Sequence, residues 1–435
     1  MSGSCEEESM RKSYGERAAG AIVFLLLIEI YFFYNTYATI GGFGVGYQYI
    51  GCIMVIMVGG VFFLVNAEVP VLYCSVRSAG VLALPYFAAM IWSAAIWIFS
   101  FTPVRQMISG FFEPAYMVLS LFSAAILVYV FKENAALYSF WALTATLLLM
   151  VLQRITEFGL TEFFRRLLIY VKSMGKNGSG VSLEDTSFSY AFVFFCIYFI
   201  FQEKSGEKEK WWKLALRFVV IIFGMLLVFK RSSFLALAVG LAAAFLYSLC
   251  KGRYRKWFVN LLAAGFTFFA IIYIPFIRYG LFNRIMEALN IDTSARTRIY
   301  SYYARYYEFS PRYTGRGLGF IWQLMGRAER FNTGLQSVNV HCDYVRFYIE
   351  LGFWGYLCWV FTVFPWLIKR LIKGIYARND AVVLGVAVAA VVLRLTENVS
   401  QLYSAVLTMG IVITQSVLNG QGIFEKESSP GKEAI

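Results

Sequence analysis

The feature that most constrains the fold of this chain is its series of long apolar runs. About twelve runs are long enough to cross a bilayer, for which roughly 20 predominantly apolar residues suffice. With 59% hydrophobic and 15% charged residues, the chain is far too apolar for a soluble globular domain. The sequence therefore predicts an all-α, polytopic integral membrane protein. The runs begin near Ala21, Val45, Ala79, Phe111, Ala135, Ser187, Trp212, Ser233, Trp257, Val345, Ala381 and Ser400.

The distribution of lysine predicts the orientation in the membrane. With the N-terminus inside, the only lysines outside the cytoplasm are Lys172, Lys176 and Lys230, as the positive-inside rule favours. Cytoplasmic loops of this kind account for much of the net charge of +13, and no nucleic-acid-binding module is recognisable.

This orientation predicts a simple division of the chain. Residues 1–20 and 421–435 form cytoplasmic tails, and residues 21–420 form the transmembrane domain. Two long loops, at about 153–186 and 278–344, then face outward, and the larger one lies between helices 9 and 10.

The larger loop is rich in arginine and lacks lysine. Its nine arginines are Arg278, Arg284, Arg296, Arg298, Arg305, Arg312, Arg316, Arg327 and Arg330. Such a cluster favours bidentate recognition of phosphate or carboxylate over diffuse attraction. The only histidine of the chain, His341, lies near the end of the loop and can move protons near neutral pH. The pattern indicates an outward-facing active site for a phosphorylated substrate.

Two nearby features leave alternatives open. Gly315, Gly317 and Gly319 could bring backbone N–H groups close to an anion, or could form a turn without a ligand. Glu350 lies within a predicted span, where it could orient Arg346 one turn away or satisfy helix packing.

The sequence indicates no cofactor and no metal. The seven cysteines show no metal-ligand spacing, and there is no acidic cluster of the DxD type that binds a divalent ion.

Short ordered motifs resemble the O-antigen ligase/polymerase family of bacterial integral membrane glycosyltransferases. His341 and Gly352 match the family's H-x10-G pattern, and Glu350-Leu-Gly-x-x-Gly355 is also typical. Arg231 matches the R-x3-L pattern in the segment KRSSFLALAVGL.

A third motif lies in the arginine-rich loop. The segment SARTRIY, followed by Pro311 and the glycine run, is similar to the family's S-x-R-x-x-I-W…P…G-x-G pattern. Arg296 takes the position of the family arginine there, with Ile299 and Tyr300 in the aliphatic and aromatic positions. The resemblance covers about residues 187–420. Cys342 departs from the pattern, because many members carry a polar residue such as Asn after the histidine.

The resemblance implies a GT-C-like fold and the transfer of glycans from undecaprenyl pyrophosphate outside the bacterial cytoplasmic (inner) membrane. His341 would be the general base, since the ordinary pKa of histidine is about 6.5. The pyrophosphate ligands would be Arg231, Arg296, Arg298 and Arg316, with Arg105 and Glu350 in supporting roles. Transfer would invert the anomeric carbon, with arginines in place of a metal ion.

Four functions compete. The first is a polymerase that joins lipid-linked repeat units of a capsule, exopolysaccharide or O-antigen. The second is a ligase that moves the glycan to lipid A core or another acceptor. The third is a flippase for lipid-linked oligosaccharides, and the fourth is a structural membrane protein. Expected partners are the lipid-linked donor, a glycan acceptor and membrane lipids, with a chain-length regulator as a further candidate and no nucleic acid.

Overall fold

The computed structural model describes most of the chain as helices. It covers residues 2–32, 37–40, 43–173, 186–202, 210–290, 296–330, 340–372 and 377–424. Within these ranges the strands are the two short antiparallel strands of a hairpin, β1 (Tyr37–Ile40) and β2 (Phe43–Gly46).

The long helices follow the apolar runs. They are α1 (Ser2–Phe32), α2 (Tyr47–Asn66), α3 (Val69–Phe99), α4 (Val104–Phe131), α5 (Ala135–Phe158), α7 (Thr186–Phe201), α8 (Trp211–Val228), α9 (Arg231–Leu249), α10 (Arg253–Arg278), α14 (Asp343–Phe361), α16 (Ala377–Thr396) and α17 (Tyr403–Gly420). The shorter elements are α6 (Leu160–Lys172), α11 (Leu281–Ala288), α12 (Arg296–Tyr303), α13 (Phe320–Arg330), α15 (Leu367–Leu371), the 3-10 turns η1 (Lys132–Asn134), η2 (Ala304–Tyr306) and η4 (Val399–Gln401), and the π turn η3 (Thr362–Trp366).

This arrangement confirms the predicted fold class, a polytopic helical membrane protein. Among the residues that the structure describes, eight helical segments are long and apolar enough to cross a membrane. One of the eight joins α4 and α5, and the apolar helix α7 is shorter than the others. A helix lies over each of the predicted apolar runs, but the number of about twelve crossings stays a prediction.

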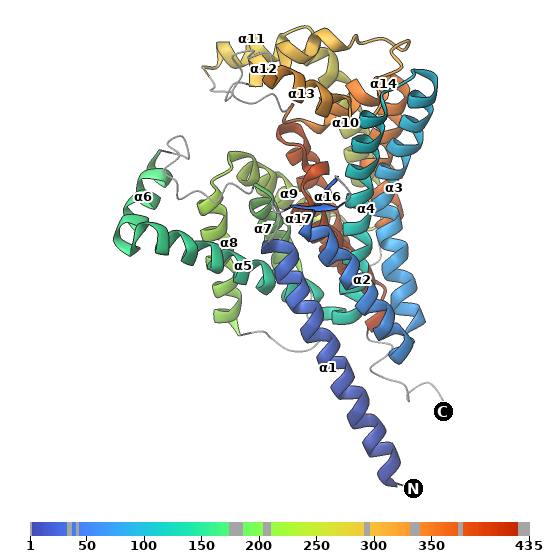
Figure 1. Ribbon diagram of the computed structural model, residues 1–435, viewed down its shortest axis with the longest axis vertical. Helices are drawn as coiled ribbons and strands as arrows, with labels where there is room; N and C mark the ends of the chain where they lie inside the picture. The colour runs from blue at the N-terminus through green and yellow to red at the C-terminus, as the bar shows by residue number, and fades with distance from the viewer. Residues whose placement is uncertain are drawn as a thin grey trace.

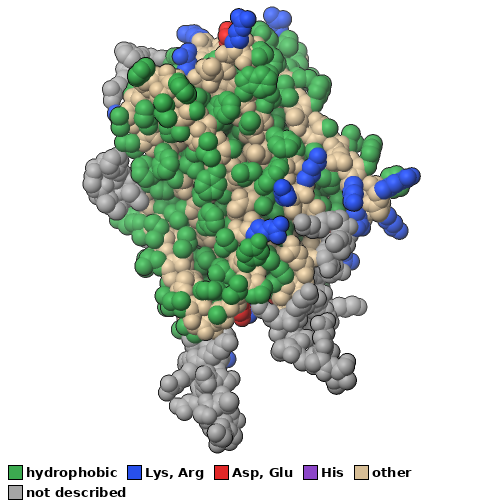
Figure 2. Space-filling view, turned by 90° about the vertical axis from the view of Figure 1, so that its right-hand side faces the viewer, with side chains coloured by type: hydrophobic (Ala, Val, Ile, Leu, Met, Phe, Trp, Pro, Cys, Tyr) green, Lys and Arg blue, Asp and Glu red, His purple; other side chains and the backbone are tan. Residues whose placement is uncertain are grey.

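The bundle is built around α17. This helix is buried along nearly its whole length, and it packs against α3, α4, α7 and α16. Hydrophobic side chains cover most of the face that Figure 2 shows, while Lys and Arg gather at its top edge and at mid-height on the right. An apolar belt of this kind suits a surface that faces lipid.

The arginine-rich loop folds as a helical layer at one end of the bundle. In Figure 1, α11, α12 and α13 lie across the top, whereas α1 begins and α17 ends at the opposite end. The layer therefore lies at the end of the bundle opposite to the start of α1 and the end of α17, while the orientation in the membrane stays a prediction. The shorter predicted loop contains α6, whose Tyr170 hydroxyl donates to the carbonyl of Val228 beside α9.

The segment that contains Gly315, Gly317 and Gly319, here called the glycine run, packs against an interruption in α14. Gly352 has φ 72° and ψ −175°, so the helix is interrupted there. The backbone N–H groups of Arg316 and Gly317 donate to the carbonyl of Glu350, at 3.1 and 2.7 Å. Gly315, Gly317 and Gly319 all have positive φ, and a Cβ at Gly315 would collide with the backbone of Gly352. The structure thus favours the turn without a ligand, because these glycine-run amides are used within the protein.

Candidate functional site

Two short segments, 341–343 and 397–400, run beside each other and hold the histidine in place. His341 Nδ1 lies 3.0 Å from a carboxylate oxygen of Glu397. The next residue, Cys342, donates its backbone N–H to the side-chain oxygen of Asn398 at 3.0 Å. Asp343 then accepts hydrogen bonds from the backbone N–H and the hydroxyl of Ser400, both at 2.9 Å. Three successive residues are therefore anchored to the turn between α16 and α17.

The backbone of His341 is strained. Its φ is +46°, in the left-handed region that residues other than glycine rarely adopt. A residue persists in such a conformation only where its surroundings enforce it, and such residues cluster at functional sites. The contacts of the neighbouring Cys342 and Asp343 supply this enforcement, while the His341 side chain stays 30% exposed.

Glu397 is the centre of the cluster. Its second carboxylate oxygen lies 3.3 Å from the guanidinium of Arg296 and 3.5 Å from the ammonium of Lys230. Only 7% of the Glu397 side chain is exposed, whereas Arg296 and Lys230 are 28% and 37% exposed. One nearly buried carboxylate thus contacts two cations and an imidazole. All three of these side chains are partly exposed to solvent.

The charge on Glu397 determines which histidine nitrogen carries the proton. Burial alone would raise the pKa of Glu397, but the hydrogen bond with His341 and the charges of Lys230 and Arg296 together lower this pKa below its ordinary value. Glu397 is therefore ionised at neutral pH and can only accept hydrogen bonds. Its partner Nδ1 must be the protonated nitrogen, so that in the neutral ring Nε2 carries the lone pair.

Helix α12 places Arg296 at this cluster. Ile299, Tyr300 and Tyr303 are buried, and they lie three, four and seven residues after Arg296 on the same side of the helix. The buried side faces the bundle, so that Arg296 also donates to the carbonyl of Thr396 at 3.0 Å. Arg296 and His341 therefore contact the same carboxylate, that of Glu397.

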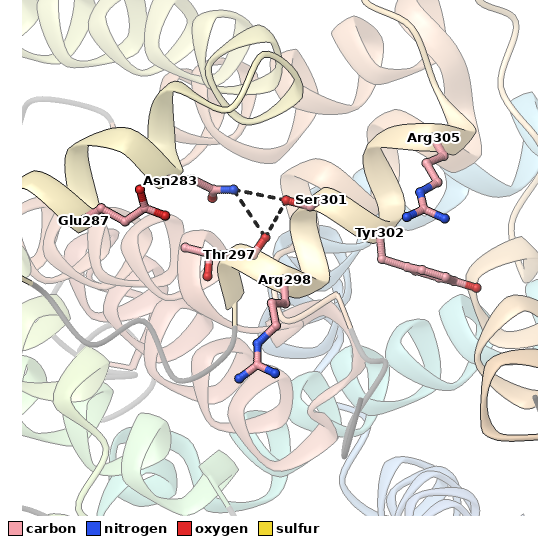
Figure 3. Close-up of a pocket in the computed structure, with 7 residues that line it drawn as sticks. All are labelled: Asn283, Glu287, Thr297, Arg298, Ser301, Tyr302 and Arg305. Atoms are coloured by element: carbon pink, nitrogen blue, oxygen red, sulfur yellow. Dashed lines mark hydrogen bonds between the residues drawn. The ribbon is translucent and has the colours of Figure 1, made fainter. Parts of the chain in front are cut away.

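Arg298 lies on a different face of α12. It lines an open cavity of about 550 Å³ whose other lining residues are Asn283, Glu287, Thr297, Ser301, Tyr302 and Arg305. Figure 3 shows this cavity, with Asn283 hydrogen-bonded to α12. Residues two positions apart project in different directions on a helix. Arg298 therefore lines the cavity, whereas Arg296 contacts Glu397 on another side of α12.

Arg231 and Arg105 are exposed at the first turns of their helices. Arg231 is the first residue of α9 and directly follows Lys230, which lies at the cluster. Arg105 follows the start of α4, beside Gln106. Neither has a recorded ion pair or hydrogen bond within the part of the chain that the structure describes.

Glu350 lies further along α14, more than two helical turns from His341, and the backbone of Arg316 packs against this part of the helix. Arg316 is exposed over the ring of Phe320, and its carbonyl accepts a hydrogen bond from Gln106. Glu350 is fully buried and accepts from Arg346 at 3.2 Å and from the backbone N–H of Ile321 at 3.1 Å. Arg346 also donates to Glu113 of α4 at 2.8 Å, so this charged group joins α14 to α4.

Cys342 departs from the family pattern, but its backbone still forms the hydrogen bond that joins the segment 341–343 to Asn398. The residue is fully buried, and burial raises the pKa of its thiol to about 12. A neutral, buried thiol cannot contact a substrate, and it is the backbone of this residue that takes part in the cluster, through Asn398.

Sequence reasoning missed the central residue of the site. Glu397 and Asn398 lie far from His341 in the sequence and outside the recognised motifs, whereas Lys230 directly precedes the motif residue Arg231. The one available signal was that Glu397 is an ionisable residue at the end of an apolar run, which is often functional in membrane proteins. Within the described ranges, no group of three or more His, Cys, Asp or Glu residues could hold a metal ion.

A comparison with known families finds a match that overlaps part of this site. Residues 216–360, about a third of the chain, match the family model described as O-antigen ligase. The match runs from α8 to α14 and includes His341, Arg231 and Arg296, whereas Glu397 lies beyond it. No curated protein matches the chain significantly.

The match confirms the predicted resemblance to the O-antigen ligase/polymerase family. The protein is thus a polytopic membrane protein of which about a third is similar to this family, and the similarity supports a ligase- or polymerase-type glycosyltransferase function on lipid-linked glycans in general terms.

Proposed function

We propose that the protein is a polymerase that joins undecaprenyl-pyrophosphate-linked repeat units into a capsule, exopolysaccharide or O-antigen. In this proposal it acts at the outer face of the bacterial cytoplasmic membrane, with both termini inside. One observation carries the proposal. The Glu397 carboxylate joins His341 on one oxygen to Arg296 and Lys230 on the other. A proton acceptor and anion-binding groups thereby share one site.

His341 is the general base of the proposed reaction. The acceptor sugar hydroxyl is a poor nucleophile until its proton is taken. With its Nδ1 proton held by Glu397, the ring offers Nε2 to that hydroxyl. As the ring becomes positively charged, the carboxylate of Glu397 stabilises it, which makes Glu397 a positioning residue.

The cations stabilise the leaving group. Arg296 and Lys230 are partly exposed beside the base, and Arg231 projects from the adjacent first turn of α9. We assign these three residues to the pyrophosphate, whose negative charge grows as the glycosidic bond breaks. They take the place that a divalent metal occupies in other glycosyltransferases. Arg105 and Arg316 lie on segments joined through Gln106, and we assign both a supporting contact with the donor, which for Arg316 replaces the expected role as a pyrophosphate ligand.

The proposed step balances as a single displacement. The hydroxyl proton moves to Nε2 of His341 while the acceptor oxygen forms a bond with the anomeric carbon. The bond from that carbon to the pyrophosphate oxygen breaks, and its electron pair leaves with the lipid pyrophosphate. Attack from the opposite side inverts the anomeric configuration.

We assign Arg298 to the saccharide instead of the pyrophosphate, in revision of the role that the motif suggested. The cavity that it lines also offers the ring of Tyr302, the guanidinium of Arg305 and the side chains of Asn283 and Glu287. Aromatic rings stack on sugar faces, and amide, carboxylate and guanidinium groups bond hydroxyls.

A ligase is the second candidate, because the family model that matches carries that description. Polymerase and ligase would use the same base and the same donor. They differ in the acceptor, which is a second lipid-linked repeat unit for the polymerase and lipid A core or another molecule for the ligase.

The test is an assay of the purified chain in detergent on a lipid-pyrophosphate-linked repeat unit, with and without a lipid A core acceptor. Lengthening of the glycan by wild type, but not by His341→Ala, supports the polymerase. Transfer to the core without lengthening supports the ligase. If wild type leaves the glycan unchanged but moves it across liposome bilayers, the glycosyltransferase proposal is wrong and a flippase replaces it.

A further inference from the structure

A second cavity lies at the opposite end of the bundle from His341. It has a volume of about 210 Å³ and is lined by Cys74, Arg77, Ser78, Val81, Trp366, Arg370, Leu371, Val417 and Gln421. The helical segment that starts at Asp343, beside His341, reaches this cavity at its other end, Leu371. In Figure 1 the start of α3 and the end of α17, which carry part of the lining, lie toward the lower right.

The charge of the cavity is positive. Its lining includes two arginines, Arg77 and Arg370, and no aspartate or glutamate. Both arginines are exposed, and no ion pair is recorded for either within the described part of the chain. Arg370 lies over the ring of Trp366, with 5.5 Å between the guanidinium carbon and the ring centroid. Such stacking orients a guanidinium while its edge stays able to donate hydrogen bonds.

Polar and apolar groups are layered in the same sense on all three walls. On each wall a polar residue lies toward the end of the bundle and an apolar residue lies one turn deeper. The pairs are Arg77 with Val81 on α3, Arg370 with Trp366 at α15, and Gln421 with Val417 at α17. The cavity is thus amphipathic along the axis of the bundle.

The arginines lie near the expected depth of lipid headgroups. Helix α3 has 31 residues and is about 46 Å long, whereas the hydrocarbon core of a bilayer is about 30 Å thick. Arg77 is eight residues, or about 12 Å, from the first residue of α3, and the helix exceeds the thickness of the hydrocarbon core by about 16 Å in total. Arg370 lies at the end of the span from Asp343 to Leu371. Long cationic side chains at such positions extend toward the interface.

We propose that this cavity binds an anionic phospholipid, with its phosphate between Arg77 and Arg370 and its acyl chains along Val81, Trp366 and Val417. Basic pockets between membrane helices bind anionic headgroups in this way. The site belongs to the leaflet opposite His341, and it stands whether or not the proposed transfer reaction does.

The experiment is a lipid titration of the full-length protein in detergent, followed by native mass spectrometry. Phosphatidylglycerol supplies the anionic headgroup and phosphatidylcholine the zwitterionic one. Removal of one charge-assisted contact should weaken phosphatidylglycerol binding about tenfold or more in Arg77→Gln and in Arg370→Gln. Lys369→Gln is the matched control, because Lys369 is the exposed neighbour of Arg370 and does not line the cavity. It should bind as wild type does.

Several outcomes would overturn the proposal. Equal weakening by Lys369→Gln and Arg370→Gln would show diffuse attraction, and equal binding of both lipids would show no headgroup recognition. Displacement of the lipid by millimolar inorganic phosphate would identify a soluble anion as the ligand. If Arg370→Gln does not fold, Arg370→Lys keeps the charge but loses the fork, and it should still bind more weakly than wild type.

Discussion

His341 Nδ1 and a carboxylate oxygen of Glu397 lie 3.0 Å apart, although the two residues are 56 positions apart in the sequence. The other oxygen of the same carboxylate contacts Arg296 and Lys230. One nearly buried side chain therefore sets the tautomer of the proposed base and its distance from the proposed pyrophosphate ligands. Each prediction below follows from this arrangement or from the contacts that hold it.

Glu397→Gln should lower kcat by about 10- to 10²-fold, because an amide can hold the ring in the wrong tautomer and cannot stabilise its positive charge. Glu397→Asp should recover part of the rate. The check is the rate of glycan transfer at several pH values, since a purely structural change would lower the rate without altering its pH profile. Glu308→Gln, at an exposed carboxylate of the arginine-rich loop, should behave as wild type.

Arg296→Ala should lower the rate of transfer by about 10²- to 10³-fold, as expected for loss of a group that stabilises developing charge. Arg296→Lys should recover only part of it, because lysine cannot bind pyrophosphate bidentately. Steady-state kinetics with the lipid-linked donor measure both. Arg298→Ala serves as the comparison and should mainly raise KM; an equal fall in kcat would contradict the separate surfaces assigned to the two arginines.

The lowered pKa of Glu397 makes a signed prediction for stability. A carboxylate whose pKa is lower in the folded state stabilises the fold above its unfolded pKa, about 4.3, and this contribution is lost as the pH falls through the folded value. The thermal midpoint of wild type should therefore exceed that of Glu397→Gln at pH 6. The difference should shrink as the pH falls below about 4. A difference that grew toward acid pH would mean that the cluster does not favour the ionised form.

Asn398→Ala should destabilise the fold by about 1–3 kcal/mol, because it leaves the buried N–H of Cys342 without its acceptor. It should also lower activity, since the strained backbone of His341 depends on its neighbours. Unfolding in detergent together with the transfer rate measures both effects. Activity that is unchanged in a destabilised Asn398→Ala would show that the position of His341 does not depend on this contact.

Gly352→Ala should destabilise the protein by about 1–2 kcal/mol or more, since its φ is +72° and a Cβ would collide with the backbone of Thr314 and Gly315. Gly265→Ala is the control, because that helical position in α10 has nothing within 4 Å of a Cβ. There alanine should be neutral or slightly stabilising. Equal destabilisation by the two substitutions would contradict the proposed packing of the glycine run on α14.

Much of the fold could be predicted from the sequence, because apolar runs of bilayer length form helices wherever water is absent. The helix starts were less certain. Helix α3 begins ten residues before the predicted Ala79, since polar residues such as Arg77 can continue a helix beyond the apolar part of a run.

The site was only partly predictable. Motifs identified His341, Arg231 and Arg296 because spacing within one segment is visible in a sequence. Glu397 was not assigned to the site, because its contact with His341 depends on how α16 packs beside the loop before α14. The opposite faces of Arg296 and Arg298 became clear only from the burial of Ile299 and Tyr300, which fixes the rotation of α12.

The most direct test of the account is a double-mutant cycle of His341→Ala and Glu397→Gln, with the rate of transfer from a lipid-pyrophosphate-linked glycan as the readout. Loss of a general base costs about 10²- to 10⁴-fold. If Glu397 acts through His341, the double variant should be no slower than His341→Ala alone, as for residues that act as a unit. If the two losses multiply, or if His341→Ala retains the wild-type rate, Glu397 and His341 do not form the base of this enzyme.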